Sequence, residues 1–133
     1  MTQTIVLTAI VLLFSASLRS KVELSASFLS SVASWGLVPP RFVRLTASSI
    51  ALAEAATVGG ALSALAMPSV ATWAVGAAAA LLAAFTVAQL AIMRASKRAD
   101  CGCFGTPMRV GAATIVRTSA LSAVFGFGWW LQV

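Results

Sequence analysis

The residues best suited to chemistry in this chain are two cysteines, which stand one residue apart in Cys101-Gly102-Cys103-Phe104-Gly105. The sequence contains no other cysteine, no histidine and no tyrosine. A thiol reacts as its thiolate, so two neighbouring thiols can form a disulfide, exchange with another thiol or bind a soft metal ion. Hypotheses about function therefore depend on this pair.

Three uses of the pair stay open. A disulfide across one residue needs unusual backbone angles, which Gly102 adopts without a side-chain penalty, and a strained disulfide is easily reduced. Thiol–disulfide exchange by Cys101 and Cys103 is therefore the favoured interpretation. The alternatives are a Cu(I) site with Met108 or Met93 as a third ligand, for which thiolate and thioether are suitable donors, and two small buried residues at a tight turn.

The residues around the pair favour a thiolate. Thr106-Pro107 predicts the N-cap and first residue of the last helix, and a helix N-terminus attracts an anion. Arg98 and Arg109 add positive charge, whereas Asp100 opposes it. We therefore expect a lowered pKa for at least one thiol, with Cys103, nearer the helix, as the candidate.

Composition places most of the chain in a lipid bilayer. Of its 133 residues, 60% are hydrophobic and 9% charged, whereas a soluble domain averages about 25% charged residues. We expect one membrane domain over residues 1–133. The net charge of +6 lies mainly at the ends of apolar runs and forms no basic helix face, so a nucleic-acid partner is not expected.

Four apolar segments predict an all-α, integral membrane four-helix bundle with helices at about 4–21, 45–67, 70–93 and 110–131. Ser15-Ala16-Ser17 resembles a signal-peptide cleavage site, but no basic residues precede the first segment, so a retained helix is favoured. Met67-Pro68-Ser69 predicts a tight turn. Small residues are expected at the helix contacts, namely Gly59, Gly60, 77–80 and 111–113.

The stretch from Lys21 to Arg44 predicts a further, amphipathic helix. Its apolar residues recur every three or four positions, at Leu24, Phe28, Val32 and Trp35. Gly36 and Pro39-Pro40 should end it. We expect it to lie in the membrane interface, and the alternatives are an extension of the first helix or ordinary core packing.

The basic residues predict an orientation. Apart from Arg117, every Lys and Arg flanks the first or third connection between the apolar segments, and none lies in the second connection or at a terminus. The positive-inside rule then puts the cysteine loop on the cytoplasmic side and both termini outside. Trp73, Trp129 and Trp130 would lie at the outer interface and Trp35 at the inner one.

Two charged residues lie inside apolar segments. Glu54 and Arg117 would be at similar depths, roughly 14 and 11 Å from the same face at the helical rise. Because a lone charge is costly in a bilayer, we predict that they form an ion pair, either as a structural tie or as part of a substrate or electron-acceptor pocket. Lys21, with Glu23, either joins this cluster or extends to the interface.

The chain resembles the MauE family of small bacterial membrane proteins, within the broader DoxX-like group, over nearly its whole length. The matching features are Lys21, Phe28, the stretch 37–39, Glu54, Cys101-Gly102-Cys103-Phe104-Gly105 and Arg117. Thr118 departs from the asparagine expected after the arginine. The resemblance implies four helices in the bacterial inner membrane and a role in maturation of methylamine dehydrogenase, whose small subunit is rich in disulfides.

The resemblance also implies a partner, either a thioredoxin-like or another disulfide-containing protein. An architectural analogy to vitamin K epoxide reductases suggests a quinone, and no other cofactor is implied. The rival hypotheses are a non-enzymatic assembly subunit, in a homo- or hetero-oligomer, and a Cu(I)-handling protein. A role in forming disulfides of exported proteins would require cysteines on the outside, whereas the positive-inside rule puts them on the cytoplasmic side. For the orientation, we follow the charge distribution.

Overall fold

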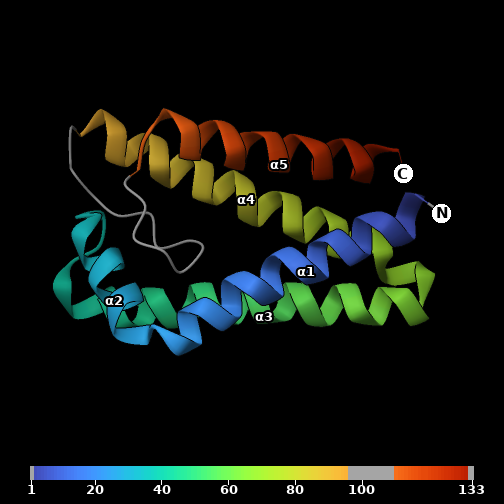
Figure 1. Ribbon diagram of the computed structural model, residues 1–133, viewed down its shortest axis with the longest axis horizontal. Coiled ribbons are helices and arrows are strands. Elements are labelled where there is room, and N and C mark those ends of the chain that lie inside the picture. The colour runs from blue at the N-terminus through green and yellow to red at the C-terminus, as the bar shows by residue number, and fades with distance from the viewer. Residues whose placement is uncertain (1, 96–109, 132–133) are drawn as a thin grey trace.

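The computed structural model describes residues 2–95 and 110–131, and every regular element in them is helical (Figure 1). The long helices are α1 (Thr2–Glu23), α3 (Val43–Ala66), α4 (Ala71–Arg94) and α5 (Ala112–Trp130). The shorter ones are α2 (Ser25–Ser34) and two 3₁₀ turns, η1 (Pro40–Phe42) and η2 (Pro68–Val70). Each long helix begins and ends within two residues of the corresponding predicted segment.

The long helices run side by side along the longest axis of the molecule (Figure 1). α1 packs mainly against α3, and α4 packs mainly against α5, while α3 joins the two pairs by its contact with α4. Both termini lie at the end of the molecule that carries η2, and α2 lies at the opposite end (Figure 1). This second end also holds the end of α4 and the beginning of α5.

Three stretches of the described chain are long and apolar enough to cross a membrane: Gln3–Glu23, Pro40–Ala66 and Pro68–Arg94. The prediction of an all-helical membrane protein is therefore confirmed. α5 has 19 residues and lies beside α4, but it is not among these three. A fourth membrane-spanning helix stays a prediction.

The helix α2 ends where the sequence predicts. It stops at Ser34, and Gly36 has φ = 61°, a conformation that glycine adopts without steric cost. Its apolar stripe, however, packs inside the protein: Phe28, Val32 and Trp35 are buried in a cluster with Ala47 and Ile92. Core packing thus accounts for the stripe, and a position in the membrane interface stays a prediction.

The beginning of α5 differs from the sequence prediction. The helix begins at Ala112 with Gly111 as its N-cap, so Thr106-Pro107 does not cap it. The side chain of Thr114 makes the cap, because its hydroxyl donates to Gly111 O (2.7 Å) and accepts from Gly111 N–H (2.8 Å). The helix N-terminus is therefore farther along the chain from the cysteines than the capping pattern suggested.

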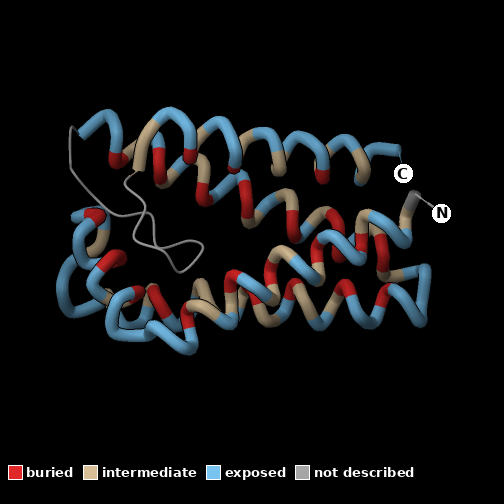
Figure 2. The backbone as a smooth tube through the Cα atoms, in the orientation of Figure 1, coloured by how far each residue is buried: buried red, intermediate tan, exposed pale blue. Residues whose placement is uncertain are grey.

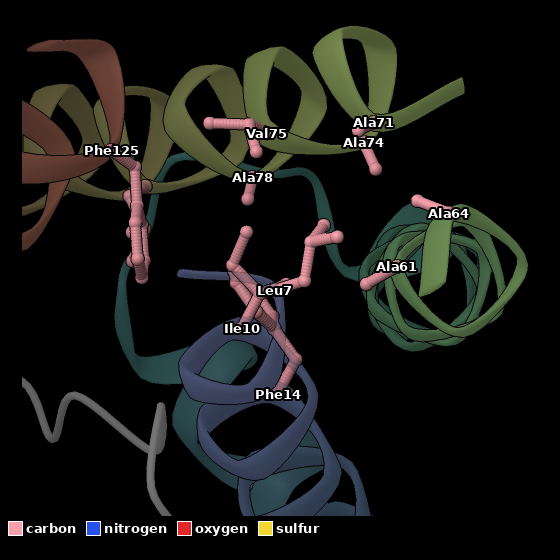
Figure 3. Packing of buried hydrophobic residues seen from close by; sticks show 11 residues of the cluster. Leu7, Ile10, Phe14, Ala61, Ala64, Ala71, Ala74, Val75, Ala78 and Phe125 are labelled. Atoms are coloured by element: carbon pink, nitrogen blue, oxygen red, sulfur yellow. The ribbon is translucent and has the colours of Figure 1, made fainter. Parts of the chain in front are cut away.

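Buried residues face the centre of the bundle, and exposed residues cover its outside (Figure 2). In the half near the termini, the large side chains of Leu7, Ile10 and Phe14 from α1 meet a wall of small residues (Figure 3). This wall consists of Ala61 and Ala64 of α3 and Ala71, Ala74, Val75 and Ala78 of α4. The small residues let the α3 and α4 backbones approach closely.

The predicted small-residue contacts are confirmed at some positions only. Gly60 lies at the α3–α4 contact, where a Cβ would be 3.8 Å from that of Ala74, and Ala78 is fully buried. Gly59 and Ala77 are exposed. A stretch rich in small residues predicts close packing of helices. Which of these residues form the contact depends on which side of the helix faces its neighbour.

Gly76 gives α5 room beside α4. A Cβ at this position would lie 3.2 Å from Nε1 and 3.3 Å from Cδ1 of the Trp129 indole. At the exposed Gly59, by contrast, a Cβ would meet nothing within 4 Å. Nearer the middle of the helices, the Ser122 hydroxyl donates to the Ala79 carbonyl of α4 (3.2 Å).

Gly76→Ala and Gly59→Ala form a matched pair that tests this contact. Replacing glycine by alanine inside a helix is worth about 0.5–1 kcal/mol. We expect Gly59→Ala to gain stability and Gly76→Ala to gain less or to lose, because the Trp129 ring must move. Thermal unfolding in detergent, followed by circular dichroism, measures the difference. Equal gains in the two variants would contradict the contact.

Candidate functional site

A buried ion pair between Lys21 and Glu54 is the main polar feature of the described structure. Nζ of Lys21 lies 2.7 Å from Oε1 of Glu54, and both side chains are 1% exposed. Lys21 comes from the last turn of α1, and Glu54 comes from the middle of α3. Because charges are rare and costly within membrane-spanning helices, such a pair is a candidate functional site.

Ser17 contributes to the hydrogen bonding of the pair. It precedes Lys21 by one helical turn, so both side chains lie on the same face of α1. The ammonium group of Lys21 donates to Ser17 Oγ (2.6 Å) and to Glu54 Oε1 (2.7 Å). The Ser17 hydroxyl donates in turn to the Glu54 carboxylate, at 3.2 Å from Oε1 and 3.4 Å from Oε2.

Two aromatic rings flank the ammonium group. Nζ of Lys21 lies 5.3 Å from the centre of the Phe28 ring and 5.9 Å from that of Phe85. A cation within about 6 Å of a ring centre is attracted by the ring's electron-rich face. Residues from α1, α2, α3 and α4 therefore combine to hold this one cation.

Further buried polar residues lie on α4 and α5. Thr118 of α5 donates to the Thr114 carbonyl (2.8 Å) and lies 3.4 Å from Oε1 of Gln89 on α4. The space bounded by Ser17, Glu54, Thr118 and apolar neighbours measures about 10 Å³. This corresponds to roughly one water molecule, so the pair is closely packed.

The structure corrects the predicted partner of Glu54. The carboxylate pairs with Lys21 of α1 and not with Arg117, which lies on an exposed face of α5. The next residue, Thr118, is the one that faces the polar core. Lys21 thus joins the buried cluster and does not extend to the interface, while Glu23 pairs with Arg19 on the outside of α1.

The cysteines, with Arg98, Met108 and Arg109, lie outside the described residues. Met93, the other proposed Cu(I) ligand, is 44% exposed near the end of α4. The described chain resumes at Val110, which packs against Phe85 and against the cluster of Phe28 and Ile92. The connection that carries the cysteines therefore rejoins the bundle beside the rings that flank Lys21.

Sequence reasoning missed Ser17, Phe85 and Gln89. The four-residue spacing of Ser17 and Lys21 was a readable signal, because it places both side chains on one helix face. Gln89 was also visible as an amide in an apolar segment. Phe85 carried no such signal, since aromatic residues in a membrane helix usually face lipid or core.

These features define a class of protein: an all-helical membrane protein with a lysine–glutamate pair buried between its helices. A family model described as "Methylamine utilisation protein MauE" matches residues 1–131. The chain belongs to the MauE family and is thus a membrane protein linked to methylamine utilisation. No curated protein and no solved structure shows significant similarity to it.

A double-mutant cycle on Lys21→Met and Glu54→Gln tests the ion pair. Each single change leaves a buried group without its charged partner and should lower the free energy of unfolding by about 3–5 kcal/mol. The double variant should lose clearly less than the sum of the two single changes. Denaturant or thermal unfolding in detergent measures all four proteins. Additive losses would show that the two groups do not interact.

Arg19 and Glu23 provide the control for this cycle. Their atoms Nε and Oε1 are also 2.7 Å apart, but the side chains are 79% and 57% exposed. Because water screens exposed charges, the corresponding cycle on Arg19→Gln and Glu23→Gln should show little coupling. A coupling as large as that of the buried pair would mean that burial is not its cause.

Proposed function

We propose that this protein exchanges disulfides with a partner protein through Cys101 and Cys103, in support of protein maturation in methylamine utilisation. The observation that carries the proposal is the contact of Val110 with Phe85, whose ring lies beside the Lys21 ammonium group. Cys103 precedes Val110 by seven residues, which limits its distance from Val110 to about 25 Å when fully extended. This length of chain allows Cys103 to approach the ion pair.

The chemical role of the ion pair follows from this tether. A nearby cation stabilises a thiolate, and the thiolate is the attacking form of cysteine. Glu54 and Ser17 hold Lys21 in one position, and the Phe85 ring of α4 lies 5.9 Å from its ammonium group. Lys21 is accordingly a positioning and electrostatic residue, and Glu54 acts through it.

The exchange conserves electrons and atoms. The thiolate of one cysteine attacks a partner disulfide, so a mixed disulfide forms and one partner sulfur leaves as a thiolate. The second cysteine attacks the first, forming the Cys101–Cys103 disulfide and releasing the other partner sulfur. The partner gains two electrons and takes up two protons, and this protein is oxidised by two electrons. The reverse sequence oxidises a partner dithiol.

A thioredoxin-like protein is the proposed partner, and a quinone is a further candidate acceptor by architectural analogy alone. We place the protein in the bacterial inner membrane with α5 as a fourth spanning helix. The cysteine connection would be cytoplasmic and the termini outside. In support, Arg19, Lys21, Arg41, Arg44 and Arg94 all belong to the end of the bundle opposite the termini.

One observation favours a second candidate function, that of an assembly subunit. An open groove of about 880 Å³ runs along α3 and α4. Small side chains dominate its lining, among them Ala53, Ala56, Gly60, Ala77 and Ala80. Such a surface lets the helix of another membrane protein approach closely. Copper that co-purifies with the protein would instead favour Cu(I) binding.

Cys101→Ser and Cys103→Ser test the redox proposal. Each variant should abolish maturation of the partner in cells, because either thiol alone cannot complete the exchange. The variant that keeps the attacking thiol should also accumulate a mixed disulfide, which acid quenching and thiol trapping detect on non-reducing gels. Full activity of both single variants would refute the proposal. A pair that stays reduced and traps no partner would support the assembly role.

Labelling of whole cells with a membrane-impermeant thiol reagent tests the orientation. If the charge pattern sets the topology, Cys101 and Cys103 should react only after the inner membrane has been permeabilised. A single cysteine introduced at Thr2 in a cysteine-free background serves as the control and should react without permeabilisation. The opposite result would place the cysteine connection outside.

A further inference from the structure

A cleft lies between α2 and the beginning of α3, at the end of the bundle opposite the termini. It has a volume of about 350 Å³. Leu29 and Ala33 of α2 form one side, and Val38 and Val43 extend the apolar lining. Arg41 and Arg44 supply its charged groups. The cleft thus combines an apolar wall with two cations, separate from the polar core described above.

The electrostatics of the cleft favour an anion. Of the acidic residues in the described chain, Glu54 pairs with Lys21 and Glu23 pairs with Arg19. Neither carboxylate is among the residues that line the cleft. The guanidinium carbon of Arg41 lies 4.8 Å from the centre of the Phe42 ring, which favours a defined direction for this side chain.

The position of the cleft indicates the source of the anion. The apolar stretch Pro40–Ala66 begins at the cleft, so the two arginines lie where a membrane-spanning segment starts. Farther along α3, Leu45 and Leu52 are 64% and 72% exposed on the outside of the helix. A bound molecule with a charged group at the arginines and a hydrocarbon chain along α3 would match both surfaces.

We propose that this cleft binds an anionic phospholipid, with its headgroup phosphate held by Arg41 and Arg44 and an acyl chain on the exposed face of α3. Guanidinium groups bind phosphate oxygens in pairs of parallel hydrogen bonds. Basic pockets at membrane-helix ends are typical sites for anionic headgroups. The apolar wall favours a lipid over free phosphate. The site is independent of the proposed redox chemistry.

Native mass spectrometry of the purified protein tests the site. Wild-type protein, titrated with phosphatidylglycerol and with phosphatidylcholine in detergent, should retain the anionic lipid preferentially. Arg41→Gln combined with Arg44→Gln should weaken phosphatidylglycerol binding by roughly 30-fold, since each basic residue near an anionic headgroup contributes about 1 kcal/mol. Arg94→Gln, at the same end of the bundle but outside the cleft, should change binding little.

A further variant tests the shape of the cleft separately from its charge. Ala33 is exposed on α2, so Ala33→Phe should fill the cleft and weaken binding without altering charge or folding. Circular dichroism confirms that each variant keeps its helices. Unchanged lipid binding in the double arginine variant would overturn the proposal, and so would an equal loss in Arg94→Gln. Displacement of the lipid by millimolar inorganic phosphate would identify a free-phosphate site and overturn the lipid assignment.

Discussion

The arrangement of the helices depends on one constraint, the removal of the Lys21 and Glu54 charges from water. An isolated buried charge costs several kcal/mol, and only a partner with good geometry offsets most of this cost. The pair therefore fixes the register of α1 against α3, because sliding either helix by one residue would separate Nζ from Oε1. Ser17 reinforces the same register, since it bonds both charged groups from α1.

The polar residues also divide the interior into two apolar regions. Along α1, the buried side chains of Leu7, Ile10 and Phe14 come first, and Ser17 and Lys21 follow. The first region contains the alanine-rich contact of α3 and α4, and the second contains the side chains that α2 contributes. Helix α2 thus packs next to the ion pair. Its residue Phe28 belongs to the second apolar region and also lies beside the ammonium group of Lys21.

Hydropathy and turn residues predicted most of the fold but not the central contact. Long apolar runs and Pro68 delimit α3 and α4 closely, and Gly36 marks the end of α2, because these signals are local. The partner of Glu54 was predicted wrongly because depth in a helix follows from residue number, whereas the direction of a side chain depends on packing. Arg117 has a suitable depth, but α5 turns Thr118 inward instead.

The start of α5 shows the same limit in another form. Thr106-Pro107 has the residue types of a helix start, yet the N-cap of α5 is Gly111. There the Thr114 hydroxyl accepts a hydrogen bond from the Gly111 N–H, and the preceding residue, Val110, packs against Phe85. Docking of Val110 is a tertiary contact that no capping rule contains. It also brings the end of the cysteine connection against Phe85, one of the two rings that flank Lys21. The functional proposal therefore rests on a contact that the sequence did not predict, because the position of Val110 beside Phe85 determines how closely the cysteine connection can approach Lys21.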